Sequence, residues 1–332
     1  MQGTGARFET QGVLWRYRNE VLTYRLGPWS LGQSTFRGAS LETSFLRLNG
    51  HPVLPDWSMV GPQVQVLLYP ALPVTHKLAT LTFCRAFVRY VTRREERYYV
   101  AFTGTFDEYL KHFSKKPRYN LQRSVRKFAE LSGGKIAWAE MKSQADMETF
   151  HTLAVAISQR SYRHQLHGFR ESAEFRRKLV EQAREGLVRG YVLMHQERPV
   201  AFALCKIQGE VITYASVGYD ADLRDHSPGN VLLYLILERL FESKEFRYLD
   251  FSPIKYFYKS FFATDHQLCA RALHFRWRLS SLIAVVMHLA VTAISKMGSS
   301  ALAMLSGERM IVRAGRETLV PVRPIMCEQP RG

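Results

Sequence analysis

Cysteine is scarce in this sequence. The four cysteines among its 332 residues are Cys84, Cys205, Cys269 and Cys327, and no two of them form a C-x-x-C pair. Structural zinc sites and disulfide scaffolds depend on closely spaced cysteines, so the sequence argues against both and against a redox C-x-x-C motif. Residues 1–12 are polar and lack the apolar core of a signal peptide. Both absences predict a cytoplasmic protein.

Acidic residues are few relative to basic ones. There are 29 Asp and Glu against 46 Lys and Arg, which gives a formal net charge of +17. This excess favours a polyanionic partner, whether nucleic acid, anionic lipid headgroups or a phosphate-rich ligand; the plainer alternative is a generally basic, solvated surface. Hydrophobic residues make up 46% of the chain and charged residues 23%. These values are typical of a folded globular protein and exclude a disordered, collagen-like or coiled-coil chain.

The first part of the chain, residues 13–103, contains no phosphate loop or catalytic motif. Its β-rich runs, separated by turn-forming residues such as Gly27 and Pro28, predict short strands. The expected strands are 13–26, 63–69, 78–90 and 98–102. We expect this half to be mainly structural.

A basic helix is expected over residues 105–132. Thr105 provides its N-cap, Gly133 and Gly134 end it, and Pro117 is expected to break or kink it midway. Its basic side chains are Lys111, Lys115, Lys116, Arg118, Arg123, Arg126 and Lys127. The pattern is typical of a solvated linking helix and equally of a surface that contacts an anion.

The periodicity is clearest from residue 135 onward. The elements expected there are, in chain order, strand 135–140, helices 144–159 and 171–186, strands 191–195, 200–207 and 211–219, a helix from Pro228 through 241, strand 247–251, helix 256–262 and strand 268–277. This order, β-αα-βββ-α-β-α-β, predicts a mixed α/β fold with α+β character and helices on both faces of a mixed sheet.

The tail is separate. Residues 279–295 carry no charge, and Arg276, Arg278 and Lys296 flank them. The uncharged run is shorter than the ~20 residues of a membrane-spanning helix. Helical spacing places its polar members on one face, and these are Ser281, His288, Thr292 and Ser295. We expect an amphipathic helix that packs on protein or lies on a membrane surface.

The segment 211–241 carries the strongest chemical signal. A strand ends, a turn follows, and a helix begins at Pro228-Gly229-Asn230. A helix N-terminus exposes unpaired backbone N–H groups to an anion, and Gly229 lets a phosphate approach the backbone closely. Arg224 lies only five residues before Gly229, close enough in the sequence for its guanidinium to contact the same anion. The alternative is an ordinary strand–turn–helix.

This order of elements, with Arg224-x-x-Ser227-x-Gly229 before the helix, resembles the GNAT acyltransferases. Their pattern is Gln/Arg-x-x-Gly-x-Gly/Ala, and here Ser227 replaces the first glycine. The resemblance implies that Arg224, Ser227, Gly229 and Asn230 hold the pyrophosphate of acetyl-CoA or another acyl-CoA, which acts as co-substrate.

Within that superfamily the chain is similar to the cellulose-biosynthesis-protein (CelD) type over residues 105–265. The segments that carry this similarity are Ser114-Lys115-Lys116-x-Arg118-Tyr119-Asn120-Leu121, Tyr219-Asp220 with Ser227-Pro228-Gly229, and Leu249-Asp250-Phe251 with Tyr258-Lys259-Ser260-Phe261-Phe262. Ser252-Pro253 stands where the family has a glycine. Such proteins, like the Fem-type aminoacyltransferases, carry two GNAT-like halves. The resemblance therefore implies a tandem GNAT-like fold: a degenerate half (1–104), a basic linking helix (105–132), an acyltransferase domain (133–278) and a helical tail (279–332).

Acyl transfer assigns roles to five residues. Tyr258 is the candidate acid for the departing thiolate, as in related acyltransferases, and Lys259 is a candidate contact to donor phosphate. Asp250 is a candidate base or orienter, or else a cap of the following turn. Backbone N–H groups near Val217 and Tyr219 are candidates to stabilise the developing oxyanion. A packed tyrosine and a solvated lysine are the plainer interpretations.

Arg163, His164 and His167 cluster between the two early helices of the second half, where GNAT proteins often receive the acceptor. They are candidate acceptor contacts, with ordinary surface side chains as the alternative. No third ligand accompanies the two histidines, so we expect no metal.

Three functions follow. The first is an acyl-CoA-dependent transferase acting on an amine or hydroxyl, such as a sugar or exopolysaccharide precursor. The second is a Fem-like transferase that uses aminoacyl-tRNA, which the charge of +17 suits. The third is a non-catalytic module that binds a membrane or a partner through its tail. An anionic membrane surface remains a candidate partner for the enzyme, at the inner face of the membrane, and the sequence leaves the oligomeric state open.

Overall fold

The chain forms two compact units. In the computed structural model, residues 6–10, 12–48, 57, 60–161, 169–253 and 256–305 are described. The main unit comprises Met1–Glu20 and Phe36–Arg278, and the hairpin–helix unit comprises Val21–Thr35 and Leu279–Gly332. All site residues predicted from the sequence belong to the main unit.

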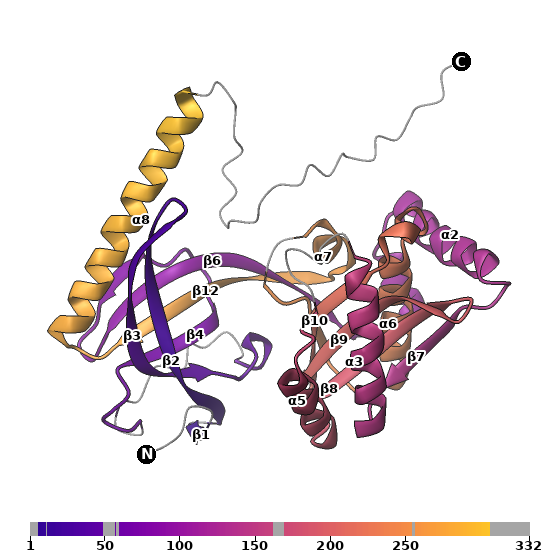
Figure 1. The fold of residues 1–332 in the computed structure, drawn as a ribbon, viewed down its shortest axis with the longest axis horizontal. Coiled ribbons are helices and arrows are strands. Elements are labelled where there is room, and N and C mark those ends of the chain that lie inside the picture. Colours follow the sequence, from indigo (N-terminus) through magenta and orange to yellow (C-terminus); the bar gives the residue numbers. More distant parts are fainter. Residues whose placement is uncertain are drawn as a thin grey trace. The chain divides into compact units, whose positions relative to one another are not determined.

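One mixed sheet contains the twelve strands of the described chain (Figure 1). The strands are β1 (Arg7–Thr10), β2 (Val13–Leu26), β3 (Trp29–Leu41), β4 (Val66–Pro73), β5 (Leu81–Phe83), β6 (Val88–Ala101), β7 (Ala137–Met141), β8 (Val188–His195), β9 (Arg198–Gln208), β10 (Val211–Tyr219), β11 (Tyr248–Asp250) and β12 (Asp265–Phe275). Their order is β1-β2-β3-β4-β12-β6-β11-β10-β9-β8-β7, and β5 pairs with β6. The β3–β4 and β10–β11 pairs are parallel. The predicted mixed α/β class is confirmed.

Helices cover both faces of strands β8 to β10. The helical elements are η1 (Phe45–Arg47), α1 (Phe106–Lys111), α2 (Lys115–Leu131), α3 (Gln144–Gln159), α5 (Ala173–Arg184), η2 (Ala221–His226), α6 (Pro228–Ser243), α7 (Phe257–Phe262) and α8 (Leu279–Leu305). Successive residues of a strand point to opposite faces. On β9, Ala201 and Ala203 accordingly pack in the core formed with α1, α2 and α6, whereas Phe202 and Leu204 pack in the core formed with α3 and α5.

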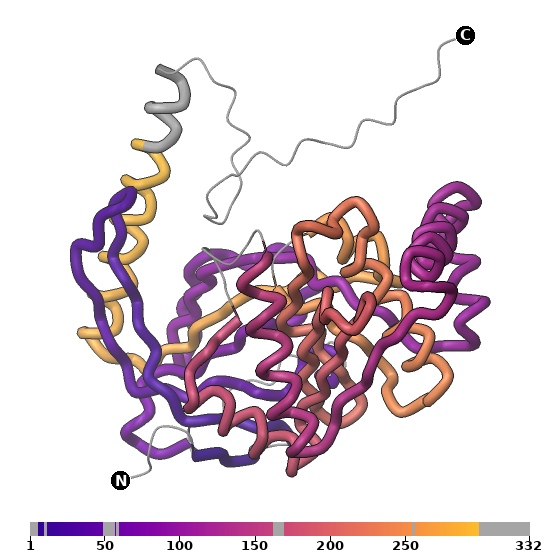
Figure 2. The backbone as a smooth tube through the Cα atoms, turned by 45° about the vertical axis from the view of Figure 1, so that its right-hand side comes forward, coloured from indigo at the N-terminus to yellow at the C-terminus, as the bar shows by residue number. Residues whose placement is uncertain are grey.

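The first part of the chain differs in detail from its sequence prediction. Strands β2, β3 and β6 are long, with 13 or 14 residues each, whereas β1 and β5 are short. The runs predicted at 78–90 and 98–102 are β5 followed by the single continuous strand β6. β12 pairs antiparallel with both β4 and β6, and the chain trace shows β6 and β12 running side by side (Figure 2). Pairing with β12 stabilises β6 as one long strand, although the local composition of its residues predicts two separate strands. The division into four domains stays a prediction.

The helix predicted over 105–132 is two helices. Thr105 caps α1 as expected, and it forms a capping box with Glu108. The chain then breaks at residues 112–114, and Ser114 precedes α2. Pro117 lies in the first turn of α2, where a missing N–H breaks no helical hydrogen bond. The break therefore lies before Pro117 and is not caused by it.

The hairpin–helix unit combines the end of the β2–β3 hairpin with α8. The Gly27 N–H donates to Ser295 Oγ at 3.0 Å, and the rings of Tyr24 and His288 lie 6.2 Å apart. α8 continues well past the uncharged run to Leu305. With Lys296 included, Leu279–Gly298 has the length and composition of a candidate membrane span, with a mean hydropathy of 1.7, so length alone does not decide whether α8 crosses a membrane.

Candidate active site at the α6 N-terminus

The parallel pair β10–β11 opens into a gap at its carboxyl end. β11 pairs with β10 only from Val211 to Thr213, and β11 itself ends at Asp250. β10 continues to Tyr219 along β9, with a register shift between Tyr214 and Ser216. The last part of β10 thus extends beyond its parallel neighbour.

The backbone of this extension faces the open side at defined positions. The Asp220 N–H donates to the Val200 carbonyl oxygen at 2.8 Å, toward β9. Because N–H directions alternate along a strand, the N–H groups of Val217 and Tyr219 point away from β9. These are the two positions proposed from the sequence for the oxyanion.

The N-terminus of α6 lies directly after this strand and the short helix η2. Ser227 precedes α6 with φ 50° and ψ 47°, the left-handed conformation that glycine adopts most readily. The N–H groups of Asn230 and Val231 bond to the Ser227 carbonyl oxygen. Pro228 has no N–H, and the Gly229 N–H makes no hydrogen bond to any described residue. This first turn therefore offers a donor to an anion.

Gly229 is closely covered by an aromatic ring. A Cβ atom added at Gly229 would lie 3.4 Å from Cδ1 of Tyr219. The predicted partner Arg224 lies on η2, where its exposed guanidinium lies 3.7 Å from the Asp225 carboxylate. The structure thus places Tyr219, at the end of β10, against the first turn of α6, with Arg224 on the adjoining η2 and Val217 two residues before Tyr219 on the strand.

A buried carboxylate fixes the loop between β10 and α6. Asp220 is fully buried, and its Oδ2 accepts hydrogen bonds from Arg160 Nε at 2.7 Å and from Arg198. Burial raises the pKa of Asp220, but the hydrogen bonds from Arg160, the Asp222 N–H and Arg198 outweigh it and hold the pKa below its usual range. In the sequence, Asp220 stands out only through the Tyr219-Asp220 segment of the family resemblance. Its arginine partners lie 60 and 22 residues away along the chain, so no local pattern pointed to them.

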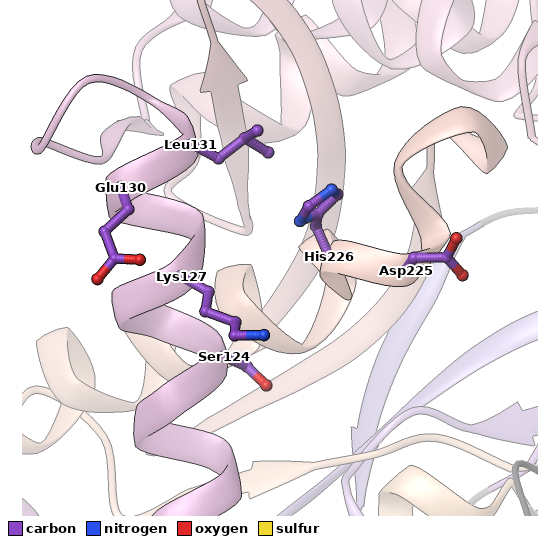
Figure 3. A pocket seen from close by; sticks show the side chains of 6 residues that line it. All are labelled: Ser124, Lys127, Glu130, Leu131, Asp225 and His226. Atoms are coloured by element: carbon purple, nitrogen blue, oxygen red, sulfur yellow. The ribbon is translucent and has the colours of Figure 1, made fainter.

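A hollow of about 350 Å³ lies between α2 and η2. Its lining residues are Ser124, Lys127, Glu130, Leu131, Asp225 and His226. Figure 3 shows Lys127 and Ser124 pointing from α2 toward η2, while Glu130 points away. None of the seven basic residues of α1 and α2 forms an ion pair with the described part of the chain. The hollow therefore holds the Lys127 ammonium group, which forms no ion pair with a described residue, together with the acidic side chains of Glu130 and Asp225.

Tyr258 lies among aromatic rings at the same end of β10. Its ring is half-buried and lies 6.5 Å from that of Tyr214 and 6.1 Å from that of Phe251. Burial, and to a lesser extent the neighbouring Tyr258, raises the pKa of Tyr214 well above its usual value. Of the two hydroxyl groups, Tyr258 is the less buried.

Asp250 and Lys259 make internal contacts. Asp250 is buried, with Oδ2 2.6 Å from the Arg97 guanidinium and Oδ1 accepting the Ser252 N–H at 3.0 Å. The Lys259 ammonium group is also buried and donates to the carbonyl oxygens of Ser252 and Pro253 at 3.3 and 3.0 Å. Both side chains hold the turn that follows β11, and their chemical roles stay predictions.

The three predicted acceptor contacts, Arg163, His164 and His167, lie outside the described residues. Within the described ranges, no group of three His, Cys, Asp or Glu side chains is placed to hold a metal ion.

The main unit is thus an α/β domain in which a parallel strand pair separates beside a helix N-terminus, an arrangement that suits a phosphate-bearing ligand. Comparison with known families gives the class: residues 115–260 match the model described as "Acetyltransferase (GNAT) domain". Over residues 115–260 the chain therefore matches a GNAT acetyltransferase domain, and the resemblance to the GNAT superfamily stated from the sequence is confirmed. No curated protein sequence matches the chain.

Several solved structures are similar in fold. A structure titled "Crystal structure of FemX" has a TM-score of 0.48 and 9% identity, covering 82% of this chain and 90% of that one. The C-terminal domain of a putative lysylphosphatidylglycerol synthetase from Agrobacterium fabrum has a TM-score of 0.48 and 14% identity, with coverage of 87% and 88%. The L-PGS structure from Bacillus licheniformis has a TM-score of 0.46 and 12% identity, with coverage of 86% and 89%. All three TM-scores lie below 0.5, which marks a remote similarity of fold.

Proposed function

We propose that this protein transfers an acyl group from acyl-CoA to an amine or hydroxyl acceptor. The observation that carries the proposal is the first turn of α6, where the Gly229 N–H is available directly beside the extended end of β10. A helix N-terminus of this kind suits the compact pyrophosphate of CoA. Acetyl-CoA is the donor we favour, because the domain matches an acetyltransferase family.

The donor would lie along the open side of β10. Its pyrophosphate would meet the Ser227–Asn230 turn, with Arg224 on the adjoining η2. The hollow beside η2 supplies Lys127 and Ser124 for further phosphate oxygens. Salt-dependent binding is expected, because Arg224 and Lys127 are exposed to solvent.

Acyl-CoA supplies the reactive group, a thioester whose carbonyl carbon can be attacked by a nucleophile. The acceptor amine or hydroxyl adds to the carbonyl carbon, and the Val217 N–H stabilises the negative charge on the oxygen. The carbon–sulfur bond then breaks, and Tyr258 gives its proton to the departing thiolate. The proton lost by the acceptor passes through solvent to restore Tyr258. Asp250 and Lys259 act by holding the turn that carries Tyr258.

The acceptor is proposed to be a sugar, an exopolysaccharide precursor or a small amine, held in part by Arg163, His164 and His167. A peripheral position at the inner face of the membrane is compatible with this acceptor class, and the surface for it is argued below. N-acylation and O-acylation are distinguished by the product.

Aminoacyl-tRNA is the second candidate donor. The observation that favours it is the set of basic side chains on α1 and α2, which have no ion-pair partner among the described residues. Phosphate neutralisation by such side chains supplies most of the non-specific affinity for nucleic acid. A purely binding function for the domain is the third candidate.

Calorimetry with CoA, acetyl-CoA and total tRNA separates these functions. Binding of CoA and acetyl-CoA without tRNA supports the proposal, and release of free thiol with a panel of sugar and amine acceptors then measures transfer. Binding of tRNA alone supports the second candidate. Binding of neither would contradict both transferase assignments.

A further inference from the structure

The amphipathic helix α8 turns its polar side toward its own unit. On this side Ser281 is buried together with the short side chains of Ala284 and Val285, the His288 ring lies against Tyr24, and Ser295 Oγ accepts the Gly27 N–H. In a soluble protein the apolar side of a surface helix normally packs inward and the polar side faces water. Here the hairpin Val21–Thr35 engages the polar side.

The opposite side of α8 is apolar and exposed. Its large side chains, at spacings of mostly three or four residues, are Leu279 (74% exposed), Ile283 (51%), Val286 (57%), Met287 (48%), Ile294 (57%) and Met297 (72%). At 3.6 residues per turn, these positions lie across the helix from Ser281, His288 and Ser295. We call them the apolar stripe. A contiguous exposed apolar surface of this kind marks an interaction site.

We propose that the apolar stripe rests on the surface of a lipid bilayer. With Met287 and Ile294 included, the apolar stripe is wider than the narrow row of contacts between two paired helices, which favours a broad surface as the occupant. No charged residue lies between Leu279 and Ser295, so the flanking ion pairs that select a second helix are missing there, which argues against a second copy as the occupant. Arg278 and Lys296 bracket the run, and the net charge of +17 favours anionic headgroups.

The helix lies in the interface and does not cross the bilayer. Crossing would place the hairpin, with its polar backbone and the exposed Arg25, in hydrocarbon, or would strip His288 and Ser295 of their contacts. An interfacial helix keeps these contacts and buries only the stripe. The proposal is independent of the acyl-transfer reaction.

Flotation of the full-length protein with vesicles tests this surface. The probes are vesicles of phosphatidylcholine alone and of phosphatidylcholine with phosphatidylglycerol. The wild type should float with both, more strongly with the anionic vesicles, and high salt should reduce the difference. Ile283→Asp combined with Ile294→Asp should lower the affinity for vesicles by about tenfold or more, because two apolar contacts with the bilayer are replaced by carboxylates, which anionic headgroups repel. Tyr119→Asp, which charges an exposed aromatic of α2 outside the stripe, should float like the wild type.

The contrary outcomes are distinct. A double variant that floats like the wild type, or a wild type that floats with neither vesicle, overturns the proposal. A dimer that the double variant abolishes, without vesicle binding, identifies a second copy as the occupant. A wild type that resists carbonate extraction spans the bilayer. Ile283→Ser with Ile294→Ser repeats the test if the aspartates impair folding, which a thermal melt detects.

Discussion

Two serines in the main unit have a backbone conformation that favours glycine. Ser227 has φ 50° and Ser252 has φ 58°. Both stand where the family pattern has glycine, one before α6 and the other after β11. A left-handed conformation costs a residue with a side chain about 1–2 kcal/mol. At both positions a serine therefore adopts a conformation that glycine adopts more easily, at a cost in stability.

Ser227→Gly should therefore raise the free energy of unfolding by about 0.5–1 kcal/mol, since relief of the strained conformation is partly offset by the greater freedom of glycine in the unfolded chain. The Ser227 side chain makes no capping hydrogen bond that would be lost. Urea unfolding of the two proteins measures the difference. Ser227→Ala is the control and should show no gain, because alanine keeps the strain. A less stable glycine variant would mean that the hydroxyl stabilises the turn.

Gly229 permits a graded test of the donor site. Gly229→Ala places one methyl group 3.4 Å from the Tyr219 ring and should be tolerated, whereas Gly229→Val adds two methyl groups against the ring and the donated N–H. We expect CoA affinity to fall by less than about threefold in the alanine variant and by about tenfold or more in the valine variant, a loss of about 1.4 kcal/mol. Calorimetry measures both. Equal affinity in a folded valine variant would move the pyrophosphate elsewhere.

Tyr258→Phe tests proton transfer. The ring packing against Tyr214 and Phe251 is retained, so CoA affinity should change little. Turnover should fall on the order of 10²–10⁴-fold, the range for removal of a general acid. Steady-state thiol release against acceptor concentration, beside calorimetry of CoA, separates the two effects. An unchanged kcat would mean that solvent, and not Tyr258, protonates the departing thiolate.

At the scale of helices and strands, prediction succeeded where the signal was local. The periodicity of 144–159 and the alternation of 211–219 located α3 and β10 with their observed bounds. Ser143 and Thr105 begin helices through capping boxes within four residues. The chain break at 112–114 was missed, because Pro117 carries the stronger local signal although a proline is harmless in a first turn.

Helix α2 gives the next prediction, because Lys127 lines the hollow and Arg126 does not. An exposed charge pair is worth about 0.2–1 kcal/mol, so Lys127→Ala should weaken CoA binding up to about fivefold at low salt and less at high salt. Arg126→Ala removes the same charge from the same helix, and its guanidinium lies over Tyr119. Calorimetry at two salt concentrations compares them. Equal losses would indicate only a general effect of charge.

At the scale of the whole molecule, pairing between distant residues decided what the sequence alone left open. Arg97 on β6 and Asp250 on β11 form a buried ion pair across 153 residues of chain. β12 reaches the strands of the first half, although the sequence placed it with the second. No local periodicity reports such partners. The donor turn was predictable because it is local, whereas the contacts that fix it, Asp220 with Arg160 and Arg198, were not.

Acid unfolding should depend on one buried histidine of β12. His274 lies between Tyr69 and Phe87, with ring centroids 4.6 and 4.5 Å away, and neither ring nitrogen has a hydrogen-bond partner in the described chain. Burial, and then the nearby charge of Arg89, lower the pKa of His274 to about 3. In the unfolded chain the pKa is about 6.5. Above about pH 6.5 the His274 imidazole is neutral in both the folded and the unfolded state. Below that pH the imidazole binds a proton in the unfolded state but stays neutral in the folded state.

His274 therefore lowers stability as the pH falls from about 6.5 toward 3, by up to about 1.4 kcal/mol per pH unit. His274→Phe removes this dependence and leaves no polar group unpaired. The free energy of unfolding of the variant, relative to that of the wild type, should be about 2 kcal/mol larger at pH 5 than at pH 8. Urea unfolding at the two pH values measures the difference. Asp220→Asn is the contrast, since its lowered pKa stabilises the fold above about pH 4 and is lost only in stronger acid. A constant difference between wild type and His274→Phe from pH 8 to 5 would show that His274 takes up its proton in the folded protein.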